Sequence, residues 1–315
     1  MISIITPTYN RKEMLLDVIN CIKNQTYQDF ELIIVDDCST DGTKEMMQNY
    51  TFDKRIKYFR NGENKGPGYN RNFGFKKATG EYIIFMDDDD YYIDNCFFEK
   101  AIHVFENNTY NNLCLVTANA YVENVKLGIR KLASIGIKGN VDGTEFLMNL
   151  GRKYAKPQST FTSVFKAEAL KKADISNMKM VNDYAIYLRA LLYGDVYVIE
   201  DAIGVYRVHS NNISSRIEKS FLLDNLAERV WVKERLLNKM DKKNIEKWWK
   251  NQMIILLKYF LLGTNPSLKD GWEVGSFMIR NSTFSFIFSI IIYLMVFSYK
   301  IIFHLKKIIK KVVKG

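Results

Sequence analysis

Mainly apolar runs alternate with amphipathic stretches through the first 90 residues of the chain. The runs at 2–5, 30–35, 56–59 and 82–86 are rich in isoleucine, valine and aromatic side chains, which predicts four buried strands. Pro7 is expected to end the first of them. Helices are predicted over 14–22, from about 43, and over about 69–78. This alternation predicts an α/β domain with a mainly parallel sheet flanked by helices.

Polar side chains follow these strands directly. Tyr9, Asp37 and Lys65 each come shortly after a strand, and a tetrad of aspartates, residues 87–90, ends the fourth. Ligands of open α/β sheets bind beyond the carboxyl ends of the strands, so one crevice should collect these residues. Adjacent carboxylates disfavour one another's ionised form, and a cation relieves that cost. Mg²⁺ or Mn²⁺ is the expected occupant, and a solvated acidic turn is the alternative.

Five blocks of sequence, in order, resemble family 2 of the nucleotide-sugar glycosyltransferases, which have the GT-A (Rossmann-like) fold. The blocks are Thr-Pro-Thr-Tyr-Asn at 6–10, Val-Asp-Asp-Cys-Ser-Thr-Asp-Gly-Thr at 35–43, Asn-Lys-Gly with Asn-Arg-Asn within 64–72, the aspartate strand at 80–90, and Tyr-Arg-Val-His at 206–209. The resemblance covers residues 1 to about 215. It implies an enzyme that transfers a sugar from a nucleotide-sugar, with UDP as the expected nucleotide, to an acceptor.

The resemblance also implies which side chains bind the donor. Pro7 and Tyr9 are assigned to donor binding, and Tyr9 is similar to the aromatic residue that stacks on the base. Asp37 is similar to the aspartate that accepts a hydrogen bond from uracil. An ionised carboxylate can only accept, and uracil offers one ring N–H, so this pairing is chemically reasonable. The candidates to offset the diphosphate charge are Lys65, Arg71 and Arg207. For Asp36 and Asp41, turn or helix-cap chemistry is the favoured interpretation.

The tetrad matches the DxD motif of the family. Asp87 and Asp89 occupy its first and last positions, and Asp87 and the intervening Asp88 are assigned to donor binding. The predicted ligands of the Mn²⁺ or Mg²⁺ ion are Asp89, Asp87 and His209. The role of His209 stays open, because neutral imidazole ligates Mn²⁺ and imidazolium pairs with phosphate. Asp90 could face the acceptor.

Inverting transfer requires a general base on the acceptor side. The family places an aspartate at the start of a late helix, usually after a glutamate, and Asp183 matches it here. Asn182 stands where the glutamate is usual, a departure that bears on the acceptor site. The alternative is that Asn182 or Asp183 only caps the helix.

Composition and charge divide the chain into three parts: a catalytic domain over 1–215, a helical extension over 216–280, and a tail over 281–315. Of the net charge of +10, six lysines between 300 and 315 supply most. The preceding 281–299 holds no charged residue. An interfacial helix on the cytoplasmic membrane face is preferred over a spanning helix, which would oppose the positive-inside tendency. Packing on the domain or in an oligomer is the soluble alternative.

Other observations narrow the class of protein. The first strand begins at residue 2, and the four cysteines lack metal or pairing patterns, so a cytosolic location is expected. A dinucleotide oxidoreductase would need GxGxxG after this strand, where the sequence has Thr-Pro-Thr-Tyr at 6–9. Nucleic-acid binding would need basic residues spread over a face, whereas the basic excess here is concentrated in the tail. Both classes are therefore disfavoured. The prediction is a metal-dependent inverting glycosyltransferase acting on a glycan acceptor, expected to be lipid-linked, in cell-surface polysaccharide synthesis. A transferase acting on a protein or a soluble glycan, or a non-catalytic nucleotide-sugar or membrane-binding protein, is the alternative.

Overall fold

The computed structural model describes residues 1–107, 112–178, 182–209, 219–263, 273 and 276. The chain divides into two compact units, Met1–His209 and Ser210–Gly315. Every side chain to which the sequence analysis assigned a role in binding or catalysis lies in the first unit.

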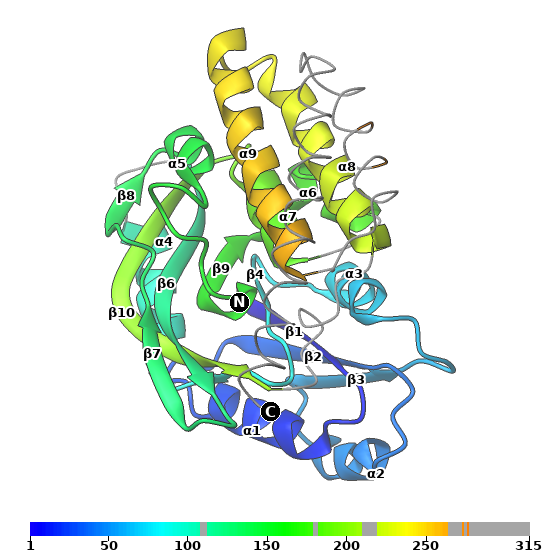
Figure 1. Cartoon of the computed structure of the whole chain (residues 1–315). Coiled ribbons are helices and arrows are strands. Elements are labelled where there is room, and N and C mark those ends of the chain that lie inside the picture. Colours follow the sequence, from blue (N-terminus) through cyan, green and yellow to red (C-terminus); the bar gives the residue numbers. More distant parts are fainter. Residues whose placement is uncertain (108–111, 179–181, 210–218, 264–272, 274–275, 277–315) are drawn as a thin grey trace, which may run out of the picture. The chain divides into compact units, whose positions relative to one another are not determined.

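The first unit is an α/β structure (Figure 1). Its strands are β1 (Ile2–Thr8), β2 (Phe30–Asp36), β3 (Ile56–Arg60), β4 (Tyr82–Phe85), β5 (Tyr91–Tyr92), β6 (Leu113–Asn124), β7 (Ile129–Ala133), β8 (Gly139–Val141), β9 (Ser163–Lys166) and β10 (Asp195–Val208). Its helices are α1 (Lys12–Lys23), α2 (Thr43–Met47), α3 (Pro67–Lys77), α4 (Phe97–Asn107), α5 (Gly143–Asn149), α6 (Ala167–Lys172) and α7 (Asp183–Ala190). The four N-terminal strands and the three N-terminal helices fall where the sequence predicted them.

The strands form one sheet in the order β3-β2-β1-β4-β9-β6-β10-β5, with β7 beside β6 and β8 beside β10. The neighbours β3, β2, β1 and β4 are all parallel, as are β6 and β10. The strands β5, β7, β8 and β9 join antiparallel. The predicted α/β class with parallel strands flanked by helices is confirmed, and the antiparallel strands are additions that the apolar runs did not indicate.

Pro7 does not end β1, which was the sequence expectation. The strand continues to Thr8, and Pro7 is in register with Val35 of β2. The backbone of Ile5 faces β4, where its carbonyl accepts from Met86 N. Pro7, two residues on, faces the same side, but β4 pairing stops at Ile5. No ladder bond is therefore lost to the missing N–H.

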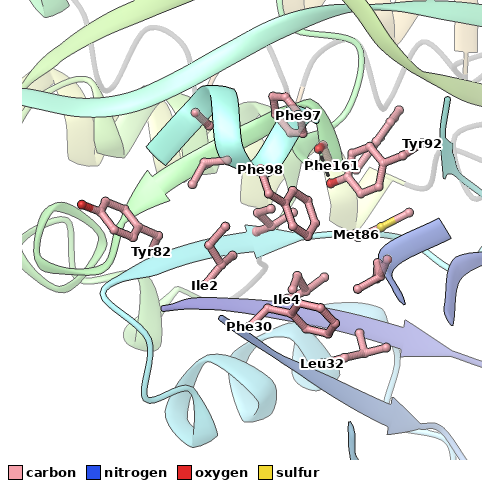
Figure 2. Close-up of a cluster of buried hydrophobic side chains, with 14 of the residues drawn as sticks. Ile2, Ile4, Phe30, Leu32, Tyr82, Met86, Tyr92, Phe97, Phe98 and Phe161 are labelled. Carbon is pink, nitrogen blue, oxygen red and sulfur yellow. Dashed lines mark hydrogen bonds between the residues drawn. The ribbon is translucent and has the colours of Figure 1, made fainter. Parts of the chain in front are cut away.

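A hydrophobic core lies between the sheet and the helices α1 and α4 (Figure 2). Alternate residues of β1, such as Ile2 and Ile4, point into it, together with Phe97 and Phe98 of α4. Alternation arises because successive strand side chains point to opposite faces. The Tyr92 hydroxyl is satisfied inside this core by donating to the Phe161 carbonyl at 2.8 Å. The core fixes β1 and β4, whose ends carry the site.

Gly74 allows α3 to approach β1 closely. A Cβ atom at this position would lie 2.4 Å from Cγ2 of Ile5. Replacing Gly74 by alanine should lower the free energy of unfolding by about 1–3 kcal/mol, because the overpacking outweighs the gain of about 1 kcal/mol in helix propensity. Urea unfolding measures this effect. Gly62→Ala, with no atom within 4 Å of the new Cβ, is the control; equal stabilities of the two variants would contradict the close approach.

The second unit contains the helices α8 (Lys219–Leu236) and α9 (Lys242–Gly263). Trp248 and Trp249 are fully buried, and the Lys233 ammonium of α8 lies 4.8 Å from the Trp249 ring centre. The two helices pack against each other. Among the residues described, no helix is long and apolar enough to cross a bilayer. The proposed membrane-associating tail at 281–315 lies outside the described residues.

Candidate active site

The carboxyl ends of β1, β2 and β4 meet at one edge of the sheet, as the strand order requires. Thr8 at the end of β1 donates its hydroxyl proton to Asp88 at 2.8 Å, across 80 residues of sequence. Asp36 at the end of β2 accepts from Ser39 N and the Tyr58 hydroxyl. Asp41 accepts from the backbone and hydroxyl of Thr43. The turn and cap interpretation of Asp36 and Asp41 is therefore confirmed.

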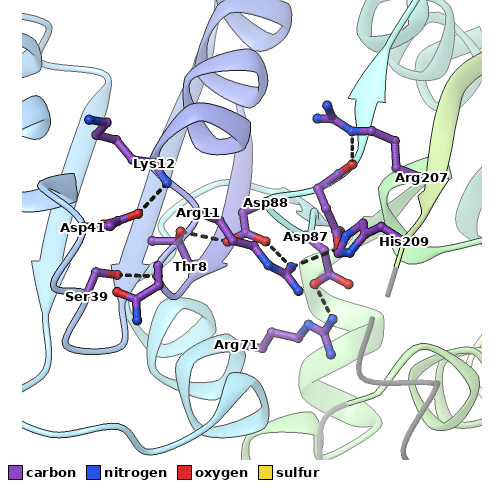
Figure 3. Close-up of polar contacts among 12 residues, drawn as sticks. Thr8, Arg11, Lys12, Ser39, Asp41, Arg71, Asp87, Asp88, Arg207 and His209 are labelled. Carbon is purple, nitrogen blue, oxygen red and sulfur yellow. Dashed lines mark hydrogen bonds and ion pairs between the residues drawn. The ribbon is translucent and has the colours of Figure 1, made fainter. Parts of the chain in front are cut away.

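Arg11 is a principal partner of the aspartate tetrad, and the sequence analysis missed it. Its Nη1 atom donates to Asp88 Oδ1 at 2.7 Å and to Asp89 Oδ2 at 2.9 Å (Figure 3). The residue immediately precedes α1, so it stands at the same sheet edge as Tyr9. Burial raises the pKa of Asp88 to about 6 even though Arg11 opposes the rise. The guanidinium thus neutralises part of the charge that the sequence analysis assigned to a metal.

Arg71 connects the tetrad to Asp183. From α3 its Nη2 atom donates to Asp87 Oδ1 and lies 4.0 Å from Asp183 Oδ1. Burial raises the pKa of Asp87, Arg71 lowers it, and the charges of Asp183 and Asp89 raise it. The structure therefore brings together Arg71, Asp87 and Asp183, which are far apart in sequence.

Asp90 is enclosed. It is fully buried, and neither carboxylate oxygen has a hydrogen-bond partner of normal geometry in the described part of the chain. Burial and the neighbouring Asp89 and Asp87 raise its pKa well above the ordinary value, with only a slight opposing effect from Ser159. The suggested acceptor-facing position of Asp90 stays a prediction.

Asp183 begins α7, and its neighbour carries out the capping. The side chain of Asn182 accepts from Ala185 N at 3.0 Å, which is the N-cap bond. Asp183 therefore does not serve as the N-cap, and its side chain is 24% exposed. Its oxygens lie 3.6 Å from Lys156 Nζ and 3.5 Å from the Thr160 hydroxyl. Its carboxylate is thus available for chemistry beside two cationic groups.

His209 and Arg207 reach the tetrad from the end of β10. The Nε2 atom of His209 lies 3.0 Å from Asp89 Oδ2. Arg207 donates to the backbone carbonyl of Asp89 and pairs with Asp17 of α1 at 3.0 Å. His209 stands where the sequence analysis placed it, beside Asp89. Arg207 is bound to protein groups at this edge, and Asp17 was not anticipated.

Asp37 organises the loop before α3. Its oxygens accept from Asn61 Nδ2, Lys65 N and Gly66 N, each at 2.8 Å. A carboxylate offers about four acceptor positions, so about one remains for a ligand N–H. Lys65 is exposed, with its ammonium 4.8 Å from the Tyr69 ring centre. Tyr9 is 46% exposed, which leaves its ring accessible for stacking.

Two neighbouring donors at the tetrad are of the types that a divalent cation accepts. Asp89 and His209 present an oxygen and a ring nitrogen 3.0 Å apart, and Mn²⁺ accepts both ligand types. The side chain of Arg11 bridges Asp88 and Asp89, so an ion there would compete with it. In the described ranges, no group of three or more His, Cys, Asp or Glu side chains is arranged as a metal site.

Comparison with protein families identifies the first unit. Residues 3–175, more than half of the chain, match the model of glycosyl transferase family 2. The chain belongs to this family. The resemblance found in the sequence blocks is therefore confirmed.

Individual relatives agree with the family match. A Campylobacter jejuni protein described as GalNAc(5)-diNAcBac-PP-undecaprenol beta-1,3-glucosyltransferase is 34% identical over 218 residues, covering 66% of this chain and 64% of the relative. The chain thus spans less than two thirds of that relative, and about a fifth of three Rickettsia glycosyltransferases.

Solved structures share the fold. The crystal structure of residues 1–349 of Staphylococcus aureus TarS with UDP has a TM-score of 0.66, 21% identity, and covers 90% of this chain and 81% of that chain. A mannosyltransferase from Pyrobaculum calidifontis with GDP-Man and Mn²⁺ has a TM-score of 0.52, 13% identity, and covers 95% and 86%. At these identities the likeness is one of fold, and the GT-A prediction is confirmed.

Proposed function

We propose that this chain is a metal-dependent inverting glycosyltransferase that moves a sugar from a UDP-sugar to a lipid-linked glycan in bacterial polysaccharide synthesis. The observation that carries the proposal is the meeting of Arg71, Asp87 and Asp183 at the sheet edge, with Asp89 and His209 beside them. Cations, metal-type donors and a carboxylate at a helix start are the groups that such a reaction needs.

The donor half of the site supports a nucleotide. Tyr9 offers an exposed ring for the base, and Asp37 keeps about one acceptor position for a ring N–H. Lys65 and Arg71 are placed to offset phosphate charge, because Lys acts as a point charge and Arg forms paired bonds to oxygens. Support for UDP comes from the TarS complex of the same fold, whose ligand is UDP.

Asp89, Asp87 and His209 are the residues we assign to a Mn²⁺ or Mg²⁺ ion. The chemistry that such an ion supplies when bound is neutralisation of the charge on the leaving diphosphate. The mannosyltransferase of this fold, crystallised with GDP-Man and Mn²⁺, supports the choice of a divalent ion. Asp88 holds Thr8 and Arg11 in place, and so contributes to the donor side through them.

Asp183 is assigned as the general base. As the acceptor oxygen forms its bond to the anomeric carbon, the bond from that carbon to the diphosphate oxygen breaks, and UDP leaves. The hydroxyl proton passes to the Asp183 carboxylate. Because the acceptor oxygen attacks the anomeric carbon on the face opposite the leaving group, the configuration of that carbon is inverted.

A lipid-linked acceptor is proposed from the C. jejuni relative, whose name describes an undecaprenol-linked substrate. Association with the cytoplasmic membrane face would bring the site to such a substrate. The basic, lipophilic tail predicted from sequence gives one means of association.

A screen of nucleotide-sugars tests the proposal against the non-catalytic alternative. The purified chain is incubated with a panel of UDP-, GDP- and dTDP-sugars, with Mn²⁺ or EDTA, and release of nucleoside diphosphate is measured. We expect slow hydrolysis of a UDP-sugar in Mn²⁺ only. Tight binding of a UDP-sugar without hydrolysis, and without transfer to lipid-linked glycan from a bacterial extract, would favour a binding protein.

Arg11 should compete with the metal. Arg11→Gln is expected to raise the affinity for Mn²⁺ without nucleotide by about tenfold, because charge-assisted hydrogen bonds to Asp88 and Asp89 no longer oppose the ion. Titration followed by Mn²⁺ electron paramagnetic resonance measures this. Arg55→Gln, which removes a pair with Asp53, is the control. An unchanged or weaker Mn²⁺ affinity in Arg11→Gln would contradict the competition.

A further inference from the structure

The hairpin of β6 and β7 carries apolar side chains in water at its tip. Val125, Leu127 and Ile129 are 53%, 64% and 46% exposed. Exposed apolar side chains that occur singly need no explanation, but three gathered on one turn indicate a binding surface. The hairpin tip, residues 125–129, is therefore a candidate contact for a partner.

The backbone holds this tip in a defined conformation. Val125 N donates to the Val208 carbonyl at 3.2 Å, and Leu127 N donates to the Asn124 side-chain oxygen at 3.0 Å. Asn124 of β6 is in register with Ile129 of β7. Ile129 and Lys131, two residues apart on one strand, share a face. Backbone hydrogen bonds and strand pairing therefore define the conformation of the tip.

Positive charge surrounds the apolar tip. Residues 123–133 contain Lys126, Arg130 and Lys131 against Glu123, so three cations minus one acid give +2. Glu123 pairs with Arg130 at 2.8 Å, which leaves the excess on the two lysines. Both lysines are exposed. Lys126 lies within the tip and Lys131 shares the face of Ile129.

We propose that the hairpin tip docks on an anionic membrane surface. Val125, Leu127 and Ile129 enter the boundary between headgroups and acyl chains, and Lys126 and Lys131 contact lipid phosphates. A bilayer offers an apolar layer and negative charge together, which is what this tip complements. A second copy would bring an equal tip of like charge, and a glycan offers little apolar surface.

The position of the hairpin links docking to the candidate active site. Val125 bonds to Val208, the residue before His209, and Arg207 is in register with Glu123 at the hairpin base. Figure 1 shows β6, β7 and β10 side by side. Docking would hold the sheet edge that carries His209 close to the membrane. The inference depends neither on catalysis nor on residues 281–315.

A depth-sensitive probe at the tip tests the docking. Full-length Leu127→Trp is mixed with phosphatidylcholine–phosphatidylglycerol vesicles whose acyl chains carry bromine, and tryptophan emission is recorded against the native chain. We expect a blue shift and additional quenching. Phe52→Trp, at a side chain 92% exposed outside the hairpin, is the control and should show neither. Sedimentation with vesicles but without quenching of the residue-127 probe, or no sedimentation, would overturn the proposal.

A second pair of variants tests the charge. Lys126→Glu with Lys131→Glu should weaken binding to anionic vesicles by about tenfold or more, because each lysine near such a surface contributes severalfold. Lys54→Glu, another exposed lysine, is the charge control. Equal losses in both, or equal binding of the native chain to neutral and anionic vesicles, would overturn the proposal. The proposal would also be overturned if Leu127→Ser left vesicle binding unchanged but lowered the sedimentation coefficient of the protein without lipid. That result would mean that the tip joins two copies of the chain.

Discussion

Replacing Asp183 by asparagine should lower the turnover of sugar transfer by about 10²–10⁴-fold, the usual contribution of a general base. The amide cannot take the acceptor proton, although it keeps the size of the side chain. Donor affinity should stay within about twofold, because a base on the acceptor side contacts the nucleotide little. Single-turnover transfer with the donor found by the nucleotide-sugar screen, and calorimetry with UDP, measure the two quantities separately.

The neighbouring cap provides the matched control for this prediction. Asn182→Ala removes the bond to Ala185 N and should cost about 1 kcal/mol of stability, yet it leaves the carboxylate of Asp183 in place. Its turnover should therefore fall far less than that of Asp183→Asn. Equal losses of turnover in the two variants would show that the reaction depends on the correct start of α7 and not on the Asp183 carboxylate. Near-native turnover in Asp183→Asn would mean that another residue is the base.

The parts of the fold that the sequence predicted are those that local pattern determines. The runs that became β1, β2 and β4 are apolar on both faces because helices cover both, so they stand out in the sequence. The strand β7 is mostly exposed and has no such pattern. In β10 the apolar run 196–199 is short, because Glu200 and Asp201 interrupt the strand where its register shifts against β6. Long strands with such irregularities leave a broken signal.

The candidate site shows the same division. Strand ends and family blocks indicated Asp37, Asp87 and Asp89 because their positions follow from local sequence. Arg11 was missed because its partners lie 77 and 78 residues away, and an arginine after a strand has many uses. Only the parallel order of β1 and β4 brings the two segments together. The burial of Asp90 was not predicted for a related reason, since it depends on packing that adjacent carboxylates do not reveal.

Replacing Asp89 by asparagine should abolish the dependence of UDP binding on a divalent ion. Asp89 has the most direct contacts at the proposed metal position, with His209 Nε2 at 3.0 Å and Arg11 Nη1 at 2.9 Å. Loss of an outer partner of a metal ligand already weakens metal binding by about 10–100-fold, so loss of a ligand should cost at least as much. Calorimetry of UDP with Mn²⁺ and with EDTA should give equal, weak affinities for the variant, and a much tighter affinity in Mn²⁺ for the native chain.

Asp201→Asn is the matched control, because it removes the same charge from a 62% exposed side chain paired with Lys100. It should keep the native difference between Mn²⁺ and EDTA. Thermal unfolding of Asp89→Asn without metal separates misfolding from loss of a ligand. Loss of the Arg11–Asp89 pair should lower Tm modestly, because Arg11 keeps its pair with Asp88, and the transition should stay cooperative. Metal-dependent UDP binding of native strength in Asp89→Asn would remove Asp89 from the metal site. Equal UDP affinity of the native chain in Mn²⁺ and EDTA would instead mean that Arg11 and Arg71 neutralise the site without an ion, since both already contact the tetrad.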